Sequence, residues 1–288
     1  MSAISRLFGK NLLKGLDEIQ ASLQAVVEKQ EFSRKVDLNK CSPEVLPVAY
    51  QINNVLETFD TAYKKQIEFI SCAAHELKTP VAVLKVNSFN AHSYTTLEQY
   101  KENYTLIEEY IERLSILVKS LLFMSRANKG TLITELKITD LSHLVRETFN
   151  GFEPYVSNMN ISMSFDIQPD LFVLCEPGQV SQIFINFVQN AFSYGRPYGY
   201  VKVSLMEEDD KVVFSVSDNG IGIAHKNIEH IWEPFWQVKK SRNNDGSSGL
   251  GLAIVKLFAD MNDAKLSVKS VLGEGTTFSV SFNKVKGN

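Results

Sequence analysis

Hydrophobic residues in roughly the first 125 positions recur at alternating intervals of three and four, which is the spacing of one face of an α-helix. Polar interruptions at residues 28–41 and near residues 88–97 divide this pattern into three long helices. Ser42 and Pro43 predict the N-cap and the first residue of the second helix. The three apolar stripes are Leu12, Leu16, Ile19, Leu23 and Val26; then Val45, Val48, Ile52, Val55, Phe59, Tyr63, Ile67, Ile70, Ala74, Leu77, Val81 and Leu84; and finally Ile107, Tyr110, Leu114, Leu117, Leu121 and Met124.

These stripes are narrow seams that repeat about every 3.5 residues, a pattern typical of coiled coils and helical bundles. A single hairpin of two such helices buries little apolar surface by itself. We therefore predict that two chains pair through residues 59–124 into a four-helix bundle, which makes the protein a homodimer. The alternative is a monomeric helical domain packed on its neighbour.

The pattern changes after residue 130, where apolar and polar residues alternate as they do in β-strands. Helical spacing returns between the strands, and Glu207–Asp210 predicts a hairpin turn. The predicted strands are 161–167, 171–175, 201–206, 212–216, 266–270 and 277–282, and the predicted helices are 141–152, 179–194 and 250–261. This order predicts an α/β sandwich with helices on one face of a mixed sheet. The fold class is therefore α plus α/β.

The composition is that of an ordinary soluble protein of about two domains, with 44% hydrophobic and 22% charged residues. A formal net charge of -3 provides no basic field, so we expect no nucleic-acid partner. No apolar stretch approaches the ~20 residues of a membrane helix. Cys41, Cys72 and Cys175 lie far apart without metal-ligand spacing, which indicates free thiols in a reducing compartment. We predict a soluble, cytoplasmic chain.

A histidine and a glutamate stand together on the second helix, at His75 and Glu76. Because Ala74 lies on the seam, His75 projects about 100° away from it, toward solvent, and Thr79 shares the face of His75 at i+4. Pro80 removes a helical amide and predicts a kink. A neutral imidazole nitrogen can attack phosphorus while Glu76 takes or orients the other ring proton. The alternative is a solvated surface pair.

Two polar motifs of the C-terminal part have the residue types of a nucleotide site. Asn186 and Asn190 stack at i+4 spacing opposite the apolar face of their helix, and their amides can hold hydrated Mg²⁺ and phosphate oxygens. Asp218 follows a strand directly and can accept a hydrogen bond from an exocyclic amine such as that of adenine. Gly220 and Gly222 allow close approach of a ligand. The alternatives are solvated amides and a tight turn.

A third motif, Gly246–Leu252, opens a helix whose apolar face is buried. Amides and the positive dipole end at a helix N-terminus form an anion site suited to phosphates. The motif is not a Walker P-loop, because no Gly-Lys-Ser/Thr follows, and it lacks the strand–glycines–helix order of a Rossmann fingerprint.

The string His75-Glu-Leu-Lys-Thr-Pro80 resembles the H-box of the sensor histidine kinases of two-component systems. The three later motifs resemble the N, G1 and G2 boxes of the ATP-binding domain in that family, whose fold is shared with gyrase, Hsp90 and MutL. Trp232–Phe235 is similar to the F-box, and Gly273–Phe278 to the last glycine box. The resemblance implies a dimeric four-helix bundle followed by an α/β sandwich of the GHKL type.

The resemblance also implies cofactors, partners and residue roles. ATP and Mg²⁺ are the expected cofactors, His75 the phosphoacceptor and Glu76 its base, and Thr79 orients water when a partner is dephosphorylated. The phosphoryl group then passes to an aspartate on the receiver domain of a response regulator. Asn190 is the implied Mg²⁺ ligand. The implied nucleotide contacts are Asn186, Asn190, Tyr194, Asp218, Gly220, Gly222, Gly249, Leu250, Gly251 and Thr276.

Two positions depart from the family pattern. Ser193 stands where the family often has a lysine that touches phosphate, and Ser247 replaces a glycine of the G2 box. Arg196 is one candidate to replace the missing cation. The other candidates are the lid residues Lys239, Lys240 and Arg242.

The motifs divide the chain into a HAMP-like relay module at 1–62, a dimerisation and histidine phosphotransfer domain at 63–128, and an ATP-binding catalytic domain at 131–285. The HAMP likeness rests on two helices joined by the charged connector Phe32–Leu38. The alternative is a generic helical extension of the stalk. A HAMP module also implies that the chain can be the cytoplasmic part of an inner-membrane receptor with membrane segments upstream.

Two other functions compete with a histidine kinase. GHKL-type ATPases place a water-activating glutamate at the position of Asn186, and asparagine cannot act as that base. A nucleotide-binding pseudokinase or scaffold is the second alternative. The retained His75, Glu76, Asn190 and Asp218 argue against it.

Overall fold

The computed structural model describes residues 3–29, 31–128, 134–150, 161–237 and 248–287. The chain divides into two compact units, residues 1–74 and 75–288, and each is considered by itself. Helix α2 (Leu46–Asn90) begins in the first unit and ends in the second.

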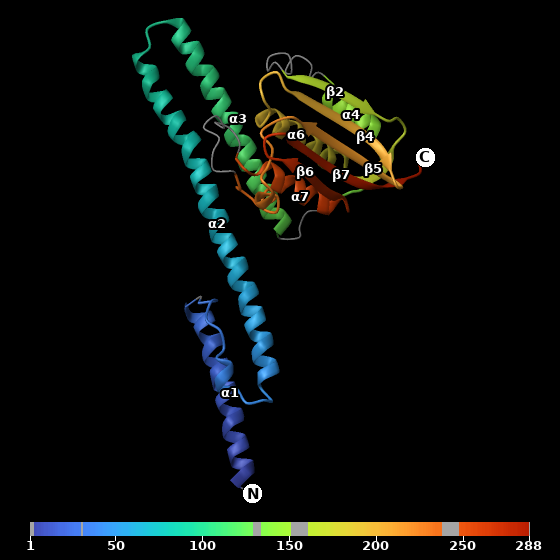
Figure 1. Ribbon diagram of the computed structural model, residues 1–288. Helices are drawn as coiled ribbons and strands as arrows, with labels where there is room; N and C mark the ends of the chain where they lie inside the picture. The colour runs from blue at the N-terminus through green and yellow to red at the C-terminus, as the bar shows by residue number, and fades with distance from the viewer. Residues whose placement is uncertain (1–2, 30, 129–133, 151–160, 238–247, 288) are drawn as a thin grey trace. The chain divides into compact units, whose positions relative to one another are not determined.

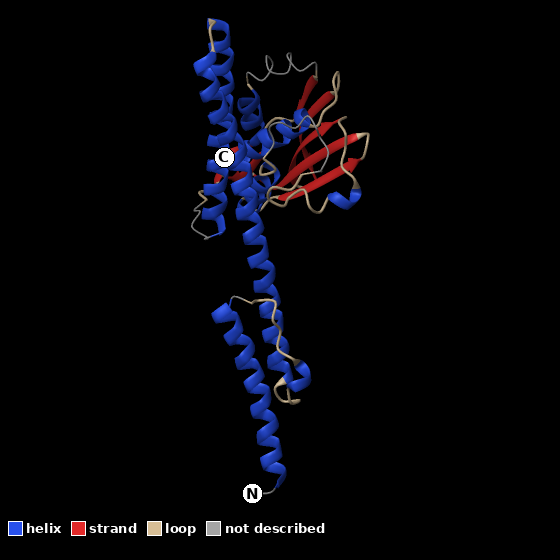
Figure 2. Ribbon diagram, turned by 90° about the vertical axis from the view of Figure 1, so that its left-hand side faces the viewer, coloured by secondary structure: helices blue, strands red, loops and turns tan. Residues whose placement is uncertain are grey.

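The first unit consists of α1 (Ala3–Lys29), a connector with the short helix η1 (Leu38–Lys40), and the first part of α2. Figures 1 and 2 show α1 and α2 running in the same direction, with the connector returning between them. Ile19, Val36, Val45 and Ala49 form its buried cluster. The predicted order of helix, connector and helix is thus present.

The predicted seam of this part is only half right. Val45 and Ile52 point inward as expected. The predicted seam residues Val48, Val55 and Phe59 are instead at least half exposed. Ala49 and Leu56, which were not predicted, are buried. In α1, similarly, Leu16 and Leu23 are exposed. Because these helices have two adjoining apolar faces, spacing alone does not say which face packs within the chain.

The connector is fixed by one asparagine of α2. The side chain of Asn53 accepts the amide of Val36 at 2.7 Å and donates to the carbonyl of Val36 at 3.1 Å. Val36 is 2% exposed, so these bonds satisfy backbone groups that water does not reach.

The start of α2 differs in detail from the prediction. The Ser42 carbonyl accepts the amides of Val45 and Leu46 at 2.9 and 3.0 Å, so a helical turn does begin at Pro43. The regular helix starts later, at Leu46, and the buried Ser42 hydroxyl has no hydrogen-bond partner among the described residues. Ser42 therefore caps through its backbone and not through its side chain.

The second unit opens with a helical hairpin made by the end of α2, η2 (Ala91–Ser93) and α3 (Leu97–Asn128). The predicted stripe of α3 is confirmed, since each of its residues is buried or half-buried. Pro80 lies inside α2, and the helix continues past it to Asn90. The kink at Pro80 stays a prediction.

A mixed sheet forms the rest of the second unit. Its order is β1-β3-β7-β5-β4-β2, with β6 also paired to β7, and β2 and β4 are its parallel pair. The strands are β1 (Lys137–Asp140), β2 (Ser162–Ile167), β3 (Phe172–Cys175), β4 (Tyr200–Glu208), β5 (Lys211–Asp218), β6 (Lys265–Val271) and β7 (Gly275–Val285). The six predicted strands are confirmed. The sequence did not predict β1, because Ile138 is the one apolar residue among its four and no alternation results.

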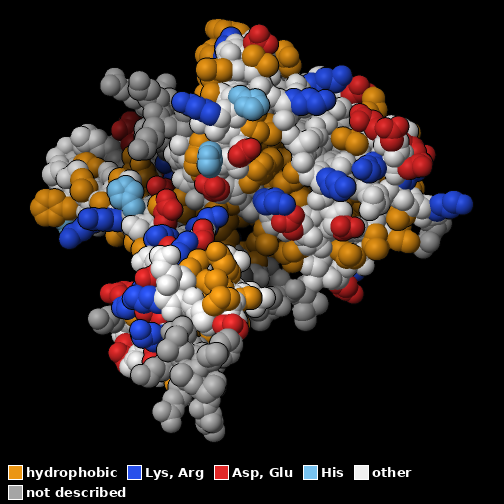
Figure 3. All heavy atoms as spheres, turned by 60° about the horizontal axis from the view of Figure 1, so that its bottom comes forward, with side chains coloured by type: hydrophobic (Ala, Val, Ile, Leu, Met, Phe, Trp, Pro, Cys, Tyr) orange, Lys and Arg blue, Asp and Glu red, His pale blue; other side chains and the backbone are white. Residues whose placement is uncertain are grey.

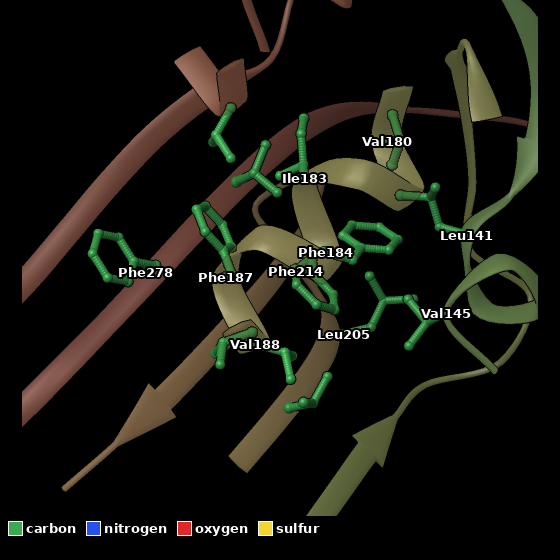
Figure 4. Packing of buried hydrophobic residues seen from close by; sticks show 14 of the residues in the cluster. Leu141, Val145, Val180, Ile183, Phe184, Phe187, Val188, Leu205, Phe214 and Phe278 are labelled. Carbon is green, nitrogen blue, oxygen red and sulfur yellow. The ribbon is translucent and has the colours of Figure 1, made fainter. Parts of the chain in front are cut away.

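Among the described helices, α4 (Leu141–Phe149), α6 (Pro177–Ser193) and α7 (Gly251–Met261) cover one face of this sheet. The end of the predicted helix 141–152 and residues 151–160 lie outside the described residues. Every second residue of β5 is buried, which is the pattern of a sheet covered on one face. Figure 4 shows the side chains of Phe184 and Phe187 on α6 packed against the sheet. The ring centroids of Phe184 and of Phe214 on β5 lie 3.9 Å apart.

The start of α6 is fixed by its own cap. The Glu176 carboxylate accepts the amides of Gly178 and Gln179 at 3.1 and 2.6 Å, and Pro177 is the first helical residue. This cap fixes the first turn of α6, and the burial of its apolar face decides which side carries the asparagines.

Candidate functional site

His75 on α2 is exposed to solvent, as predicted, and so is Thr79 one turn further along the helix. The Thr79 hydroxyl donates to the His75 carbonyl at 3.4 Å, which places the two residues on one side of the helix. Partial burial raises the pKa of the Glu76 carboxyl above its ordinary value, and the neighbouring His75 opposes this shift. A carboxylate of raised pKa is a stronger base toward an imidazole proton.

A cavity of about 810 Å³ lies in the second unit. It brings together nine of the ten nucleotide residues that the family resemblance implied: Asn186, Asn190, Tyr194, Asp218, Gly222, Gly249, Leu250, Gly251 and Thr276. Gly220 is the tenth and does not line the cavity, but its amide donates to the Asp218 carboxylate at 2.8 Å. Its role is to hold Asp218, not to form the wall.

The acidic end of the cavity is Asp218, the last residue of β5. Its side chain is buried, and burial raises its pKa, while hydrogen bonds from the amides of Gly220 and Thr276 oppose the shift. A buried carboxylate fixed in this way can accept a hydrogen bond from an exocyclic amine in the cavity.

The loop after Asp218 requires glycine at two positions, 220 and 222. The Tyr194 carbonyl accepts the amide of Ile221 at 3.1 Å, and a Cβ added to Gly220 would lie 2.2 Å from that carbonyl oxygen. Gly222 has φ +67, and its Cβ would lie 2.0 Å from the carbonyl oxygen of Val271. Backbone packing thus explains these two glycines without any ligand.

Gly222→Ala should destabilise the protein more than Gly273→Ala. Both glycines have positive φ, so alanine at either costs about 1–2 kcal/mol of backbone strain. A Cβ at Gly273 meets nothing within 4 Å, whereas at Gly222 it meets backbone. Thermal unfolding of the two variants measures the difference, and equal losses would show that the loop moves aside for the new methyl group.

The amide end of the cavity is formed by α6 and the start of α7. The Asn186 side chain donates to the Gln182 carbonyl at 2.8 Å, which turns its Oδ1 toward α7. A Cβ on Gly251 would lie 2.7 Å from that oxygen, so glycine permits this close approach and a larger residue would displace the Asn186 side chain. No side chain caps the first turn of α7 among the described residues, which leaves its amides available to an anion.

The residues at this end fit a hydrated Mg²⁺ ion. The Asn190 Nδ2 is buried and has no hydrogen-bond partner among the described residues, so it can donate to a phosphate oxygen or to a water of the ion's shell, which leaves its Oδ1 for the ion. The described residues contain no group of three or more His, Cys, Asp or Glu side chains that could hold a metal. Mg²⁺ keeps several waters and takes few protein oxygens, which suits the amide oxygens of Asn186 and Asn190.

The F-box and G2 residues meet directly. The amide of Phe235 donates to the Gly249 carbonyl at 2.9 Å, and the Trp232 ring packs edge-on against Phe278 at 6.0 Å. Ser193 lines the cavity, but Arg196 does not, because its guanidinium is hydrogen-bonded to the Gly273 carbonyl. Ser247 and the proposed lid cations Lys239, Lys240 and Arg242 lie outside the described residues.

One wall of the cavity is formed by α3, which the sequence motifs did not predict. Ile116, Lys119, Ser120 and Phe123 of α3 line it together with the residues of the α/β domain. The spacing of these four residues predicts that they share one face of a helix. It does not predict which surface that face contacts.

An exposed histidine on a helical hairpin, followed by an α/β sandwich with a pocket of amide side chains and glycines, is the arrangement that the resemblance to histidine kinases implied. Two family models match the chain in the corresponding order. The His Kinase A (phospho-acceptor) domain matches residues 65–130, and the Histidine kinase-, DNA gyrase B-, and HSP90-like ATPase matches residues 175–286. The chain belongs to the sensor histidine kinase family.

Individual relatives agree with this assignment. The signal transduction histidine-protein kinase ArlS of Staphylococcus aureus is 24% identical over 287 residues, which cover 98% of this chain and 62% of the relative. The chain thus spans about three fifths of that protein's length.

Two solved structures are similar as well. Full-length ShkA in complex with AMPPNP is 25% identical with a TM-score of 0.57, covering 76% of this chain and 46% of ShkA. Histidine kinase ThkA in complex with response regulator TrrA has a TM-score of 0.61 at 22% identity, over 79% of this chain and 66% of that one, and shows the fold.

The surface and the helices add two observations. On the face seen in Figure 3, acidic and basic side chains of the described residues are interspersed. Among the described helices, none combines the length and the apolar character that crossing a membrane requires.

Proposed function

We propose that this chain binds ATP with Mg²⁺ and transfers the γ-phosphoryl group to His75. The observation that supports this proposal is the cavity, which gathers a buried acidic acceptor, the amide side chains of Asn186 and Asn190 and an uncapped helix N-terminus, in a chain whose His75 is exposed. A ring nitrogen of His75 attacks the γ-phosphorus, the bond to the bridging oxygen breaks, and ADP leaves. Glu76 takes the other ring proton.

The cavity residues position the nucleotide for this step. Asp218 accepts the exocyclic amine of adenine, and the first amides of α7 bind phosphate oxygens. Asn186 and Asn190 hold Mg²⁺, which neutralises charge on the phosphates when it is bound. Because asparagine cannot activate water as a base, transfer to histidine is favoured over hydrolysis.

We further propose that the protein acts as a homodimer. Leu97, Tyr104, Ile111 and Val118 of α3 recur every seven residues and are 72%, 62%, 54% and 42% exposed. Ile67, Ile70 and Val81 of the predicted α2 seam are also more than half exposed. Such heptad stripes need a partner helix to bury them, and a second copy supplies it in a four-helix bundle.

The proposed acceptor of the phosphoryl group is an aspartate on the receiver domain of a response regulator. The complex of ThkA with TrrA is a precedent in a related fold. We also propose that the chain removes phosphate from that partner, with the Thr79 hydroxyl orienting water beside His75. Residues 1–62 would serve as the HAMP-like relay, 63–128 as the phosphotransfer domain and 131–285 as the catalytic domain, and all would work in the cytoplasm.

The test is incubation of the purified chain with γ-labelled ATP, with and without Mg²⁺. The expected result is protein-bound label that resists alkali and is lost in acid, because a phosphorus–nitrogen bond has that chemistry. Release of phosphate without labelled protein would favour a GHKL-type ATPase instead. Binding of ATP without either product would favour a pseudokinase.

A further inference from the structure

The α3 wall of the cavity is formed by one helix face. Its members, Ile116, Lys119, Ser120 and Phe123, follow the i, i+3, i+4, i+7 spacing of neighbours on a helix. The Phe123 ring lies 4.7 Å from the ring of Phe258 on α7, so this face is seated on the α/β domain. The hairpin that carries His75 thus also contributes to the cavity of the α/β domain.

The wall supplies the positive charge of the cavity. Of the described residues that line it, Lys119 has the only cationic side chain, and Asp218 has the only acidic one. Lys119 is exposed, and its ammonium forms no hydrogen bond or ion pair with another described residue. A lysine without a partner among the residues that the structure describes, in a cavity that also holds the unpaired Asn190 amide and the uncapped start of α7, is available to an anionic ligand.

Lys119 and the first residues of α7 line the same cavity. The face of α3 that carries Lys119 is anchored one turn away, where the Phe123 ring contacts Phe258 of α7. Because the lysine has a flexible four-carbon stem, its ammonium can move within the cavity toward a ligand held at the start of α7.

We propose that Lys119 binds the phosphate groups of the nucleotide, so that α3 forms a charged wall of the ATP site. The proposal rests on the proposed function, because it takes the cavity as that site. It makes Lys119 a positioning residue that distinguishes a triphosphate from a nucleoside. It also couples the seating of α3 on the α/β domain to the phosphates that the cavity holds.

The test measures the affinities of the full chain for ATP and for adenosine by calorimetry, in the wild type and in Lys119→Ala, Lys119→Arg and Lys101→Ala. Lys101 is an exposed lysine of the same helix that does not line the cavity. We expect Lys119→Ala to weaken ATP binding about three- to tenfold and to leave adenosine binding unchanged. Lys119→Arg should restore most of the loss, and added salt should shrink the difference.

The outcomes separate the two proposals. If the wild type binds ATP and Lys119→Ala binds it equally well, the role of Lys119 is refuted while the ATP site stands. A parallel loss of ATP and adenosine, or an equal loss in Lys101→Ala, would mean that the lysine acts through the fold, and would also refute it. If the wild type binds neither ligand, the proposed function itself fails.

Discussion

Replacement of His75 by glutamine should abolish the incorporation of label from γ-labelled ATP, by at least about a thousandfold. Glutamine has a similar size and remains on the exposed side of α2, but its amide nitrogen has no free lone pair to attack phosphorus. The measurement is acid-labile label per chain. Loss of the nucleophile, unlike loss of a positioning group, leaves no slower route to the same product.

The matched control is His92→Gln, which removes another exposed histidine of the same hairpin, in η2. This variant should label like the wild type. ATP affinity should also be unchanged in His75→Gln, because His75 is not among the residues that line the cavity. Equal labelling of His75→Gln and the wild type would assign the acceptor to a different residue.

Asn190→Ala should reduce labelling by about a hundredfold or more, because it removes one of the two amide oxygens that we assign to Mg²⁺. The specific signature is in binding: Mg²⁺ should strengthen ATP binding to the wild type and have little effect on the variant. The variant should still fold and dimerise. The Asn190 Nδ2 is buried without a partner among the described residues, so its removal leaves no new unsatisfied group.

Asn283→Ala is the matched control for this variant. Asn283 is an exposed asparagine of β7 that does not line the cavity, so its loss should change neither labelling nor the effect of Mg²⁺. If Asn190→Ala responds to Mg²⁺ as the wild type does, then Asn190 is not a metal ligand and Asn186 is the next candidate.

Much of the fold follows from local patterns along the chain. The alternation in β4 to β7 and the 3.6-residue period of α6 and α7 give each element its type, because one face of each must be apolar to be buried. In β1 only Ile138 is apolar, so that strand showed no such pattern. In α1 and α2 the pattern was present twice, on adjoining faces, so the choice of Ala49 and Leu56 over Val48 and Val55 came from packing.

For the site residues too, local sequence and tertiary packing each decide a different part. The sequence by itself determined the chemistry of the site: an exposed histidine beside a glutamate, two amides one turn apart, and an acid followed by glycines, each within a segment shorter than ten residues. Only the tertiary structure decided which segments meet. It places Gly251 against Asn186, Gly220 against the Tyr194 carbonyl, and the α3 wall on the cavity. The physical reason is that the period of a helix or strand fixes the direction of a side chain, whereas its neighbour depends on packing between distant segments.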